Sequence, residues 1–143
     1  GYDEHYRGSE EAGSVASYPY VEQGIQKMLE EVPKEKVINA VPFFTRFWKT
    51  DVEGSVTSEA IGMDEEDVKV QNNNAEKVWN ETCKQYYVEF DYDGSTYQMW
   101  MEEENSIEEK MKLIKQYDLA GVSSWRLGYE RSSIWDVILK YVN

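Results

Sequence analysis

The sequence predicts an α/β fold in which two parallel strands alternate with helices, with a small α+β unit inserted between the strands. Two short runs, residues 37–41 and 119–125, are apolar or small without regular polar alternation, which is typical of parallel strands covered on both faces. Apolar residues at helical spacing lie on either side of these runs. From residue 50 to 104, strand-like runs and a tight-turn signal indicate an antiparallel sheet instead.

Composition excludes several classes of function. The chain has 143 residues and a formal net charge of −13, from 15 Lys+Arg and 28 Asp+Glu. So acidic a surface repels phosphate backbones and anionic lipids, so we expect neither nucleic acid nor membrane as a partner. The single cysteine, Cys83, excludes an internal disulfide framework, and one histidine is too few for catalytic zinc, which takes about three protein ligands. We therefore expect no metal and no cofactor.

The first part of the chain, residues 1–49, is predicted to contain a loop, a helix and a strand. Residues 1–17 are rich in Gly and Ser, which favours a loop. Pro19 suits the first turn of the helix, and Pro33 ends it. The helix is indicated by one apolar stripe: Val21, Ile25, Met28, Leu29 and Val32.

Residues 50–104 are predicted to form the α+β unit. Asp64 is placed to cap a short acidic helix that ends in Asn72–Asn74. Asp93-Gly94 is a strong signal for a tight hairpin turn. The expected strands are residues 77–80, 85–91 and 96–101.

Residues 105–143 return to the helix–strand–helix pattern, with the strand at 119–125. Helix starts are indicated by capping-box spacings, in which a polar side chain and an acid three residues later satisfy free backbone N–H groups. The candidate pairs are Asn105 with Glu108, Ser106 with Glu109, and Ser133 with Asp136.

Two parallel strands flanked by three helices leave both edges of a sheet open, which a self-sufficient domain avoids. We therefore interpret the chain as the C-terminal end of a longer repeating β/α fold. Open edges and apolar faces favour association, so we expect this fragment to self-associate. The residues expected to lose partners are Val37, Ile38, Val41, Leu119 and Val122.

Aromatic and arginine residues crowd the expected C-terminal ends of the strands, in Tyr2-Asp3, residues 42–48 and residues 125–130. Rings stack on the C–H faces of pyranoses while polar groups bond their hydroxyls, so this pattern suggests a sugar site. An equally weighted alternative is that Trp48 and Trp125 cap the core.

Other polar groups are assigned structural roles. His5 is interpreted as a structural hydrogen-bonding residue rather than a base. The acidic runs Asp64–Asp67 and Glu102–Glu104 are interpreted as solvated helix starts, which the helix dipole favours.

Three motifs in order resemble glycoside hydrolase family 18, in its bacterial spore-cortex and cell-wall, chitinase-like branch that is often fused to LysM modules. Residues 2–6 with 8–17 resemble its sixth strand and following loop, residues 41–48 its seventh strand, and residues 119–126 its eighth. The resemblance implies the C-terminal portion, about strands 6–8, of a TIM (β/α)8 barrel. Residues 50–104 fall where this family places its α+β insertion domain.

The resemblance implies roles for particular residues. Tyr2 matches the tyrosine that hydrogen-bonds the substrate acetamido carbonyl, and Asp3 the aspartate that positions this group. Trp125 matches the family tryptophan whose ring lies under the sugar being cleaved. Arg46 and Trp48 are assigned to the substrate groove, as is Phe44, where the branch commonly has tyrosine.

The general acid of the family is missing from this chain. The family's Asp-x-x-Asp-x-Asp-x-Glu motif follows strand four, and the nearest approach here, Asp64–Lys69, fails at the third aspartate. The resemblance therefore implies a fragment that is inactive alone, from an extracellular, cell-wall or spore-associated hydrolase. The parent would cleave β-1,4-linked N-acetylglucosamine polymers, peptidoglycan or chitin, by substrate-assisted retaining catalysis. The alternatives are a non-catalytic chitinase-like lectin and an independent α+β interaction module.

Overall fold

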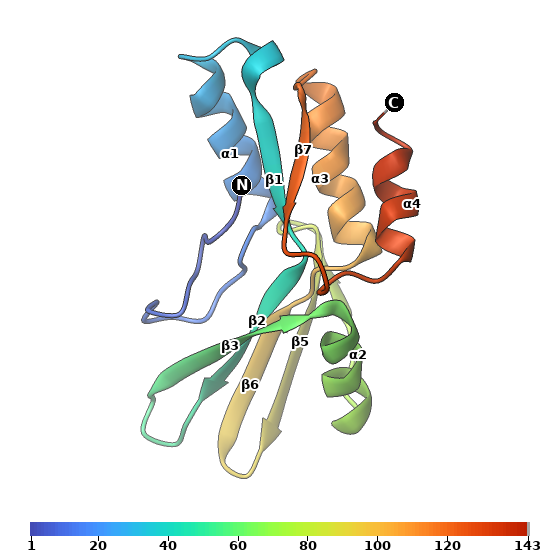
Figure 1. Cartoon of the computed structure of the whole chain (residues 1–143). Coiled ribbons are helices and arrows are strands. Elements are labelled where there is room, and N and C mark those ends of the chain that lie inside the picture. Colours follow the sequence, from blue (N-terminus) through green and yellow to red (C-terminus); the bar gives the residue numbers. More distant parts are fainter. Residues whose placement is uncertain (143) are drawn as a thin grey trace.

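The structure is a computed structural model that describes residues 1–142, and it has two layers of different construction (Figure 1). The first is a parallel pair, β1 (Ile38–Pro42) and β7 (Gly121–Trp125), whose register runs from Ile38 opposite Gly121 to Pro42 opposite Trp125. Helices α1 (Tyr18–Leu29), α3 (Glu104–Gln116) and α4 (Ser133–Leu139) accompany this pair, and a 3-10 turn (Lys34–Lys36) precedes β1. The strand–helix alternation predicted from the sequence is present.

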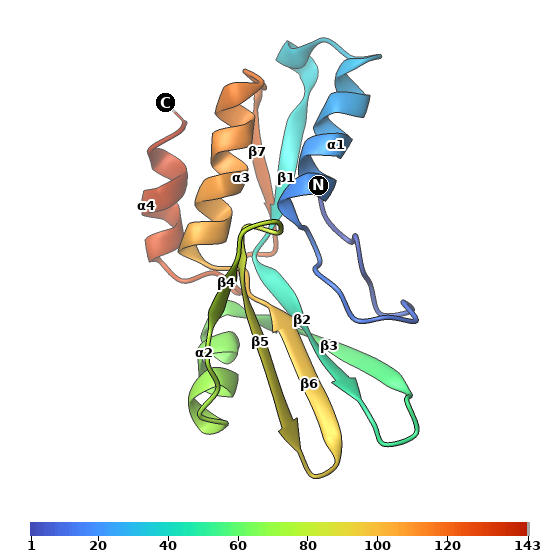
Figure 2. The ribbon, with the colours of Figure 1, turned by 180° about the vertical axis from the view of Figure 1, so that it is seen from behind.

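The second layer is a five-stranded antiparallel sheet with strand order β3-β2-β6-β5-β4 (Figure 2). Its strands are β2 (Phe44–Thr50), β3 (Val56–Gly62), β4 (Val78–Asn80), β5 (Gln85–Tyr92) and β6 (Ser95–Trp100), with α2 (Met63–Asn72) after β3. Asp93 and Gly94 both have positive φ in the turn between β5 and β6, which explains the Asp-Gly hairpin signal. The three strands expected in this unit are confirmed within one or two residues.

Two hydrophobic cores follow the two layers. One lies between the parallel pair and α3 and α4, and the other between the five-stranded sheet and α2. A smaller cluster packs α1 against α3. The first core contains Val41, Phe43, Met63, Ile107, Met111, Ile114, Ile134, Val137 and Ile138, and the second Phe47, Ile61, Val88, Met99 and Met101.

The segment after β1 joins the other layer. Residues 44–50, of which 44–48 belong to the run that resembles the seventh strand, form β2 in the five-stranded sheet, which thus starts before residue 50. The physical reason is alternation: Phe47 enters the core beneath α2, while Phe44, Arg46 and Trp48 share the opposite face.

Helix ends also differ from the sequence reading. Helix α1 ends at Leu29 rather than at Val32, because a residue that precedes proline, here Val32, disfavours helical geometry. Gly62 rather than Asp64 is the N-cap of α2, since β3 runs directly into that helix. The N-cap of α4 is Ser132 rather than Ser133, and the Ser132 side chain forms no capping hydrogen bond; the Ser133 hydroxyl donates to Glu104 at 2.7 Å.

The capping box of α3 is formed by Glu103, not by Asn105 or Ser106 acting as the N-cap. The Glu103 carboxylate accepts from the backbone N–H groups of Asn105 and Ser106, and the Ser106 hydroxyl accepts from the Glu103 N–H. An acid at the N-cap followed by serine three positions later reverses the usual order of this motif.

The acidic runs are not all solvated. Glu66 and Glu102 are 0% exposed, at the junction between the two layers. Glu102 accepts from Lys110 Nζ at 2.8 Å, from Ser106 Oγ at 2.6 Å and from Gln85 Nε2 at 3.2 Å, and Lys110 is itself buried. The two cores are therefore joined through a buried ion pair with its own hydrogen-bond network.

Glu66 occupies the same junction. Its Oε1 accepts the backbone N–H of Glu102 at 2.7 Å, while its Oε2 is buried without a partner. Burial raises the pKa of Glu66 well above its ordinary value, so the group tends to hold its proton.

Among residues 1–142, no helix combines the length and apolar composition that a membrane span requires. The same residues contain no group of three or more His, Cys, Asp or Glu side chains placed to hold a metal ion.

Candidate functional site

The sequence-predicted residues gather where β1 and β7 end. Tyr2 packs edge-to-face on Phe44, with ring centroids 6.0 Å apart, and Phe44 packs on Tyr129 at 6.2 Å. The Arg126 guanidinium lies 4.1 Å from the centroid of the Tyr129 ring, within cation–π range. We call Tyr2, Phe44 and Tyr129 the aromatic floor.

Two members of this arrangement were not among the residues assigned to the site, namely Tyr129 and Arg126. The signal was present in the sequence, because both belong to the aromatic and arginine segment 125–130. A tight junction fixes Tyr129: its carbonyl accepts the Met63 N–H at 2.8 Å, and any Cβ at Gly62 would lie 2.9–3.1 Å from Tyr129 atoms. Glycine at position 62 therefore lets the loop after β7 rest against the start of α2.

Tyr2 and Asp3 enter the site from the N-terminal segment. Tyr2 is partly buried, Asp3 is exposed, and Asp3 has φ of 67°, a left-handed conformation that Asp tolerates better than most residues. Burial, with a smaller contribution from the Asp3 charge, raises the pKa of Tyr2. The Tyr2 phenol therefore stays protonated at neutral pH and can donate a hydrogen bond.

The loop that follows is closed by its own hydrogen bonds. The Glu4 N–H donates to the Val15 carbonyl at 2.8 Å, and the Ser17 hydroxyl lies 2.7 Å from both carboxylate oxygens of Glu4. His5 Nδ1 lies 2.8 Å from the Ser14 carbonyl oxygen. These bonds use His5 and Glu4 to hold the loop, and with it the position of Tyr2 and Asp3.

Trp125 and Trp48 have opposite environments. Trp125 is 55% exposed at the end of β7, on the face turned away from the helix-packed core. Its carbonyl accepts the Phe43 N–H at 2.6 Å, and the Trp125–Arg126 peptide bond is cis. Trp48 is 1% exposed, and its indole N–H donates to the Gly13 carbonyl at 2.9 Å. Trp125 thus offers a free ring surface.

Trp48 does not fit the substrate-contact role assigned to it from the sequence. The loop through Gly13 and Ser14 covers the face of the sheet on which Trp48 lies, and Ser14 bonds Gln85 beside it at 2.5 Å. The indole is therefore part of the packing beneath this loop. Its core role was the alternative weighed for both tryptophans.

Arg46 lies on the same face of β2 as Phe44, two residues further along the strand. Its Nη1 donates to the Ser58 hydroxyl on β3 at 3.1 Å, whereas its Nε is buried without a partner. Phe44 is 6% exposed and packs between the rings of Tyr2 and Tyr129. Together these residues offer ring surfaces, a phenol donor and two guanidinium groups, which suit a polar ligand with C–H faces.

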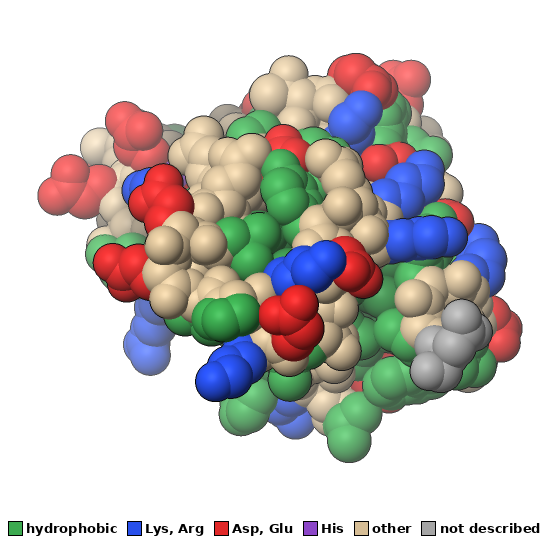
Figure 3. All heavy atoms as spheres, turned by 90° about the horizontal axis from the view of Figure 1, so that it is seen from above, with side chains coloured by type: hydrophobic (Ala, Val, Ile, Leu, Met, Phe, Trp, Pro, Cys, Tyr) green, Lys and Arg blue, Asp and Glu red, His purple; other side chains and the backbone are tan. Residues whose placement is uncertain are grey.

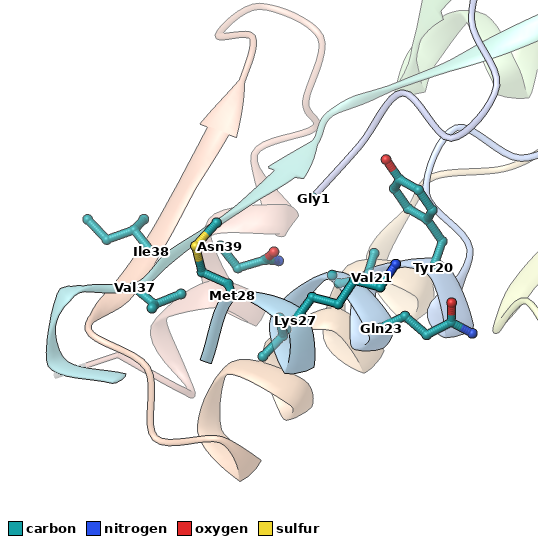
Figure 4. A pocket seen from close by; sticks show the side chains of 11 residues that line it. Gly1, Tyr20, Val21, Gln23, Lys27, Met28, Val37, Ile38 and Asn39 are labelled. Carbon is teal, nitrogen blue, oxygen red and sulfur yellow. The ribbon is translucent and has the colours of Figure 1, made fainter. Parts of the chain in front are cut away.

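A separate groove of about 370 Å³ runs between α1 and β1, lined by side chains from both (Figure 4). It begins at Gly1 and follows the unpaired edge of β1, where Ile38 is 60% exposed and Asn39 Nδ2 is buried without a partner. Seen from the end at which β1 begins, hydrophobic side chains are visible among charged ones (Figure 3). An apolar groove along a free strand edge suits packing of another strand rather than sugar chemistry.

Comparison with known proteins gives a consistent result. A family model described as "Glycosyl hydrolases family 18" matches residues 2–130. The uncharacterized glycosylase YvbX of Bacillus subtilis is 31% identical over 140 residues, which are 97% of this chain and 40% of that protein. A cortical fragment-lytic enzyme of Bacillus subtilis is 26% identical over 113 residues, covering 78% of this chain and 26% of that enzyme.

Solved structures share the fold. A chitinase from Chromobacterium violaceum superposes with a TM-score of 0.88 at 22% identity, covering 99% of this chain and 43% of that one. The spore cortex-lytic enzyme SleL of Bacillus cereus gives a TM-score of 0.89 at 19% identity, covering 99% and 33%. The chain thus spans less than half of these relatives. The predicted fold class, a C-terminal portion of a TIM (β/α)8 barrel with an inserted α+β unit, is confirmed.

Proposed function

The chain belongs to glycosyl hydrolase family 18, and from that premise we propose that it is the substrate-binding part of a glycosidase that cleaves β-1,4-linked N-acetylglucosamine polymers, chitin or peptidoglycan. One observation carries the proposal. The exposed ring of Trp125 lies where the parallel strands end, and so does Tyr2, a member of the aromatic floor whose phenol is protonated. In barrels of this kind, active sites are built at that end of the strands.

Each residue then has a role in a substrate-assisted retaining reaction, in which the acetamido oxygen of the substrate attacks its own anomeric carbon. The Tyr2 hydroxyl donates to the acetamido carbonyl, and Asp3 positions the acetamido group. Trp125 stacks under the sugar that is cleaved. Phe44 supports the floor beside Tyr2, and Arg46 lines the groove.

The leaving oxygen needs a general acid within hydrogen-bond reach. No segment of residues 1–143 has the spacing of the family's acid motif, so this chain orients the substrate without protonating the leaving group. We therefore propose that the chain alone is inactive and that its parent protein is the hydrolase. The names of the relatives, a cortical fragment-lytic enzyme and a spore cortex-lytic enzyme, favour an extracellular, cell-wall or spore location.

The test is the release of reducing ends from N-acetylglucosamine oligomers and from peptidoglycan. We expect activity from the parent protein and none from this chain alone. Activity of this chain alone would overturn the division of roles. Binding of the oligomers by the parent protein without cleavage would identify a chitinase-like lectin instead.

Trp125→Ala in the parent protein tests the stacking role. It should reduce kcat/KM on a soluble oligosaccharide by the equivalent of about 1–3 kcal/mol, mostly in kcat if the ring supports a distorted sugar. Tyr92→Ala is the matched control, because Tyr92 is an exposed aromatic residue, 66% accessible, at the β5–β6 hairpin and away from the site. Equal kinetics for both variants would make Trp125 a structural residue.

A further inference from the structure

Gln85, the first residue of β5, links the five-stranded sheet to the loop that follows Tyr2 and Asp3. Its side chain is fully buried although it is a polar amide. The Ser14 hydroxyl donates to Gln85 Oε1 at 2.5 Å, across 71 positions of sequence, and Gln85 Nε2 donates to Glu102 Oε2 at 3.2 Å. Because a buried amide needs hydrogen-bond partners at both its ends, these bonds connect the loop to the junction between the two layers.

The orientation of this amide is set by its partners. A carboxylate accepts hydrogen bonds and donates none, so the NH2 group of Gln85 faces Glu102 and its oxygen is left for Ser14. Glu102 is held in turn, because the buried ammonium of Lys110 donates to its other oxygen at 2.8 Å. The Ser14 hydroxyl therefore bonds an oxygen whose position is determined by a buried ion pair on the far side of the amide.

Ser14 passes this constraint to the residues beside it. Its side chain is buried, and its hydroxyl also accepts the Ala16 N–H at 3.2 Å. The carbonyl of Val15 accepts the Glu4 N–H at 2.8 Å. Since Glu4 directly follows Asp3, the segment that Ser14 anchors is paired with the backbone that carries the predicted site residues.

Tyr2 depends on the same segment through packing. Its ring packs against the small hydrophobic cluster to which Ala16 belongs, and Ala16 is fully buried there. On the other side of Ser14, the Gly13 carbonyl accepts the Trp48 indole N–H at 2.9 Å. Two side chains of the five-stranded sheet thus hold adjacent positions of the loop against which Tyr2 rests.

We propose that Gln85, acting through the Ser14 hydroxyl, is a positioning residue for Tyr2, so that the five-stranded sheet sets where the acetamido group of the substrate is held. The inference rests on the proposed function and adds to it a role for a buried residue that does not touch the substrate. A nucleophile that belongs to the substrate must be aligned with its own anomeric carbon, and a misplacement of about 1 Å can lower a rate about 100-fold. The bond from Gln85 therefore acts on the chemical step more than on affinity.

The test begins with steady-state kinetics of the parent protein on N-acetylglucosamine oligomers. Ser14→Ala should lower kcat about tenfold and change KM by less than about twofold, because the oligomer still binds but its acetamido group is aligned less often. Gln85→Met keeps the length of the side chain without its polar ends and should act in the same direction. Ser9→Ala is the matched control, since the Ser9 hydroxyl accepts the Tyr6 N–H at 2.9 Å within the tip of the same loop. It should leave kcat unchanged.

A double-mutant cycle shows whether the effect runs through Tyr2. In a Tyr2→Phe background, which already lacks the phenol, Ser14→Ala should lower kcat by less than about threefold. A general structural role predicts the same loss in both backgrounds.

Hydrogen exchange of the parent protein gives a readout independent of catalysis. The backbone N–H groups of Glu4 and Ala16 should exchange at least about tenfold faster in Ser14→Ala, whereas those within α3 should keep their rates. Faster exchange in α3 as well would show that the Ser14 bond supports the whole fold, and would overturn the specific role.

The outcomes separate the two proposals. A loss in kcat that appears in Ser14→Ala and Gln85→Met, shrinks in the Tyr2→Phe background and is absent from Ser9→Ala supports positioning. Unchanged kcat in the first two variants, or equal losses in both backgrounds, would overturn positioning while the glycosidase proposal stands. A parent protein that cleaves no substrate would overturn the proposed function and the catalytic role of Gln85 with it.

Discussion

The five-stranded sheet and the parallel strand pair are built on different principles. All strands of the sheet come from residues 44–100, most neighbours are joined by short connections, and α2 covers the hydrophobic face. Strands β1 and β7 are adjacent in space but lie far apart in sequence, and each has a free edge. The sheet completes its core from nearby sequence, whereas the parallel pair buries only its helix side and leaves the other face and both edges open.

This difference locates the candidate site. The open face of the parallel pair carries Trp125, and the junction with the sheet adds Phe44 and Arg46. A site at the border of a rigid, self-contained unit and an open layer can draw residues from both. Its geometry then depends on the buried polar junction that holds the two layers together.

The largest effect is expected from breaking that junction. Lys110→Ala leaves the buried Glu102 carboxylate without its cation, and removing one partner of a buried pair costs about 3–5 kcal/mol. The free energy of unfolding from urea denaturation measures the loss. Lys112→Ala, two residues along the same helix and exposed, should change it by less than about 0.5 kcal/mol. Similar values for both variants would mean that the junction does not couple the layers.

The second prediction contrasts the two faces of β1. Val41 is fully buried against the helices, so Val41→Ala should cost about 2 kcal/mol of unfolding free energy. Ile38 is 60% exposed on the open side, so Ile38→Ala should cost less than about 0.5 kcal/mol in this chain. The same Ile38 substitution should become more costly in the parent protein. If Ile38→Ala is as destabilising as Val41→Ala in this chain, the open face is covered in solution.

A third prediction concerns the pH dependence of the junction. Because burial raises the pKa of Glu66 above the ordinary value of 4.5, the folded protein retains a proton that the unfolded chain releases. The Glu66 contribution to stability therefore falls as pH rises from 4.5 through the raised pKa. Glu102, Glu103 and Arg131 are the charged groups acting on it.

Glu66→Gln removes this titration. The variant should gain stability relative to the unmodified chain as pH rises from 4.5 through the raised pKa of Glu66, as measured by urea denaturation across that range. Glu65→Gln, at the exposed neighbouring position, is the control and should show no such trend. A pH-independent difference for Glu66→Gln would show that the carboxyl is ionised in the folded state.

The smallest effect on the monomer is expected at the free edge of β1. This chain should self-associate at tens of micromolar by light scattering, and Ile38→Lys should weaken association because a charge on an exposed edge opposes strand pairing. Monomer stability should change by less than about 0.5 kcal/mol. Val52→Lys, at the exposed turn after β2, should leave association unchanged. A clean monomer for the unmodified chain would contradict the prediction.

Much of the fold was predictable because its signals are local. Asp93-Gly94 specified the β5–β6 hairpin, Pro19 marked the first turn of α1, and the apolar run beginning at Val37 marked β1. Local signals failed to predict helix caps where a group distant in sequence formed a hydrogen bond with the capping side chain or with the first backbone N–H of the helix. Ser133 at the start of α4 gives its hydroxyl to Glu104 at the start of α3, and the N-terminal N–H of α2 at Met63 is taken by the Tyr129 carbonyl.

The sequence by itself determined the strand and helix types, the inserted unit and the aromatic and arginine segments at the strand ends, because these depend on residue spacing and turn chemistry. Only the tertiary structure decided burial. It placed Trp48 beneath the Gly13 loop and left Trp125 exposed, and it buried Glu66 and Glu102 in runs that read as solvated. It also brought Tyr129 against Phe44 and Arg126 over the Tyr129 ring. Burial depends on which distant segments meet, and the local pattern of a tryptophan or a glutamate does not encode that.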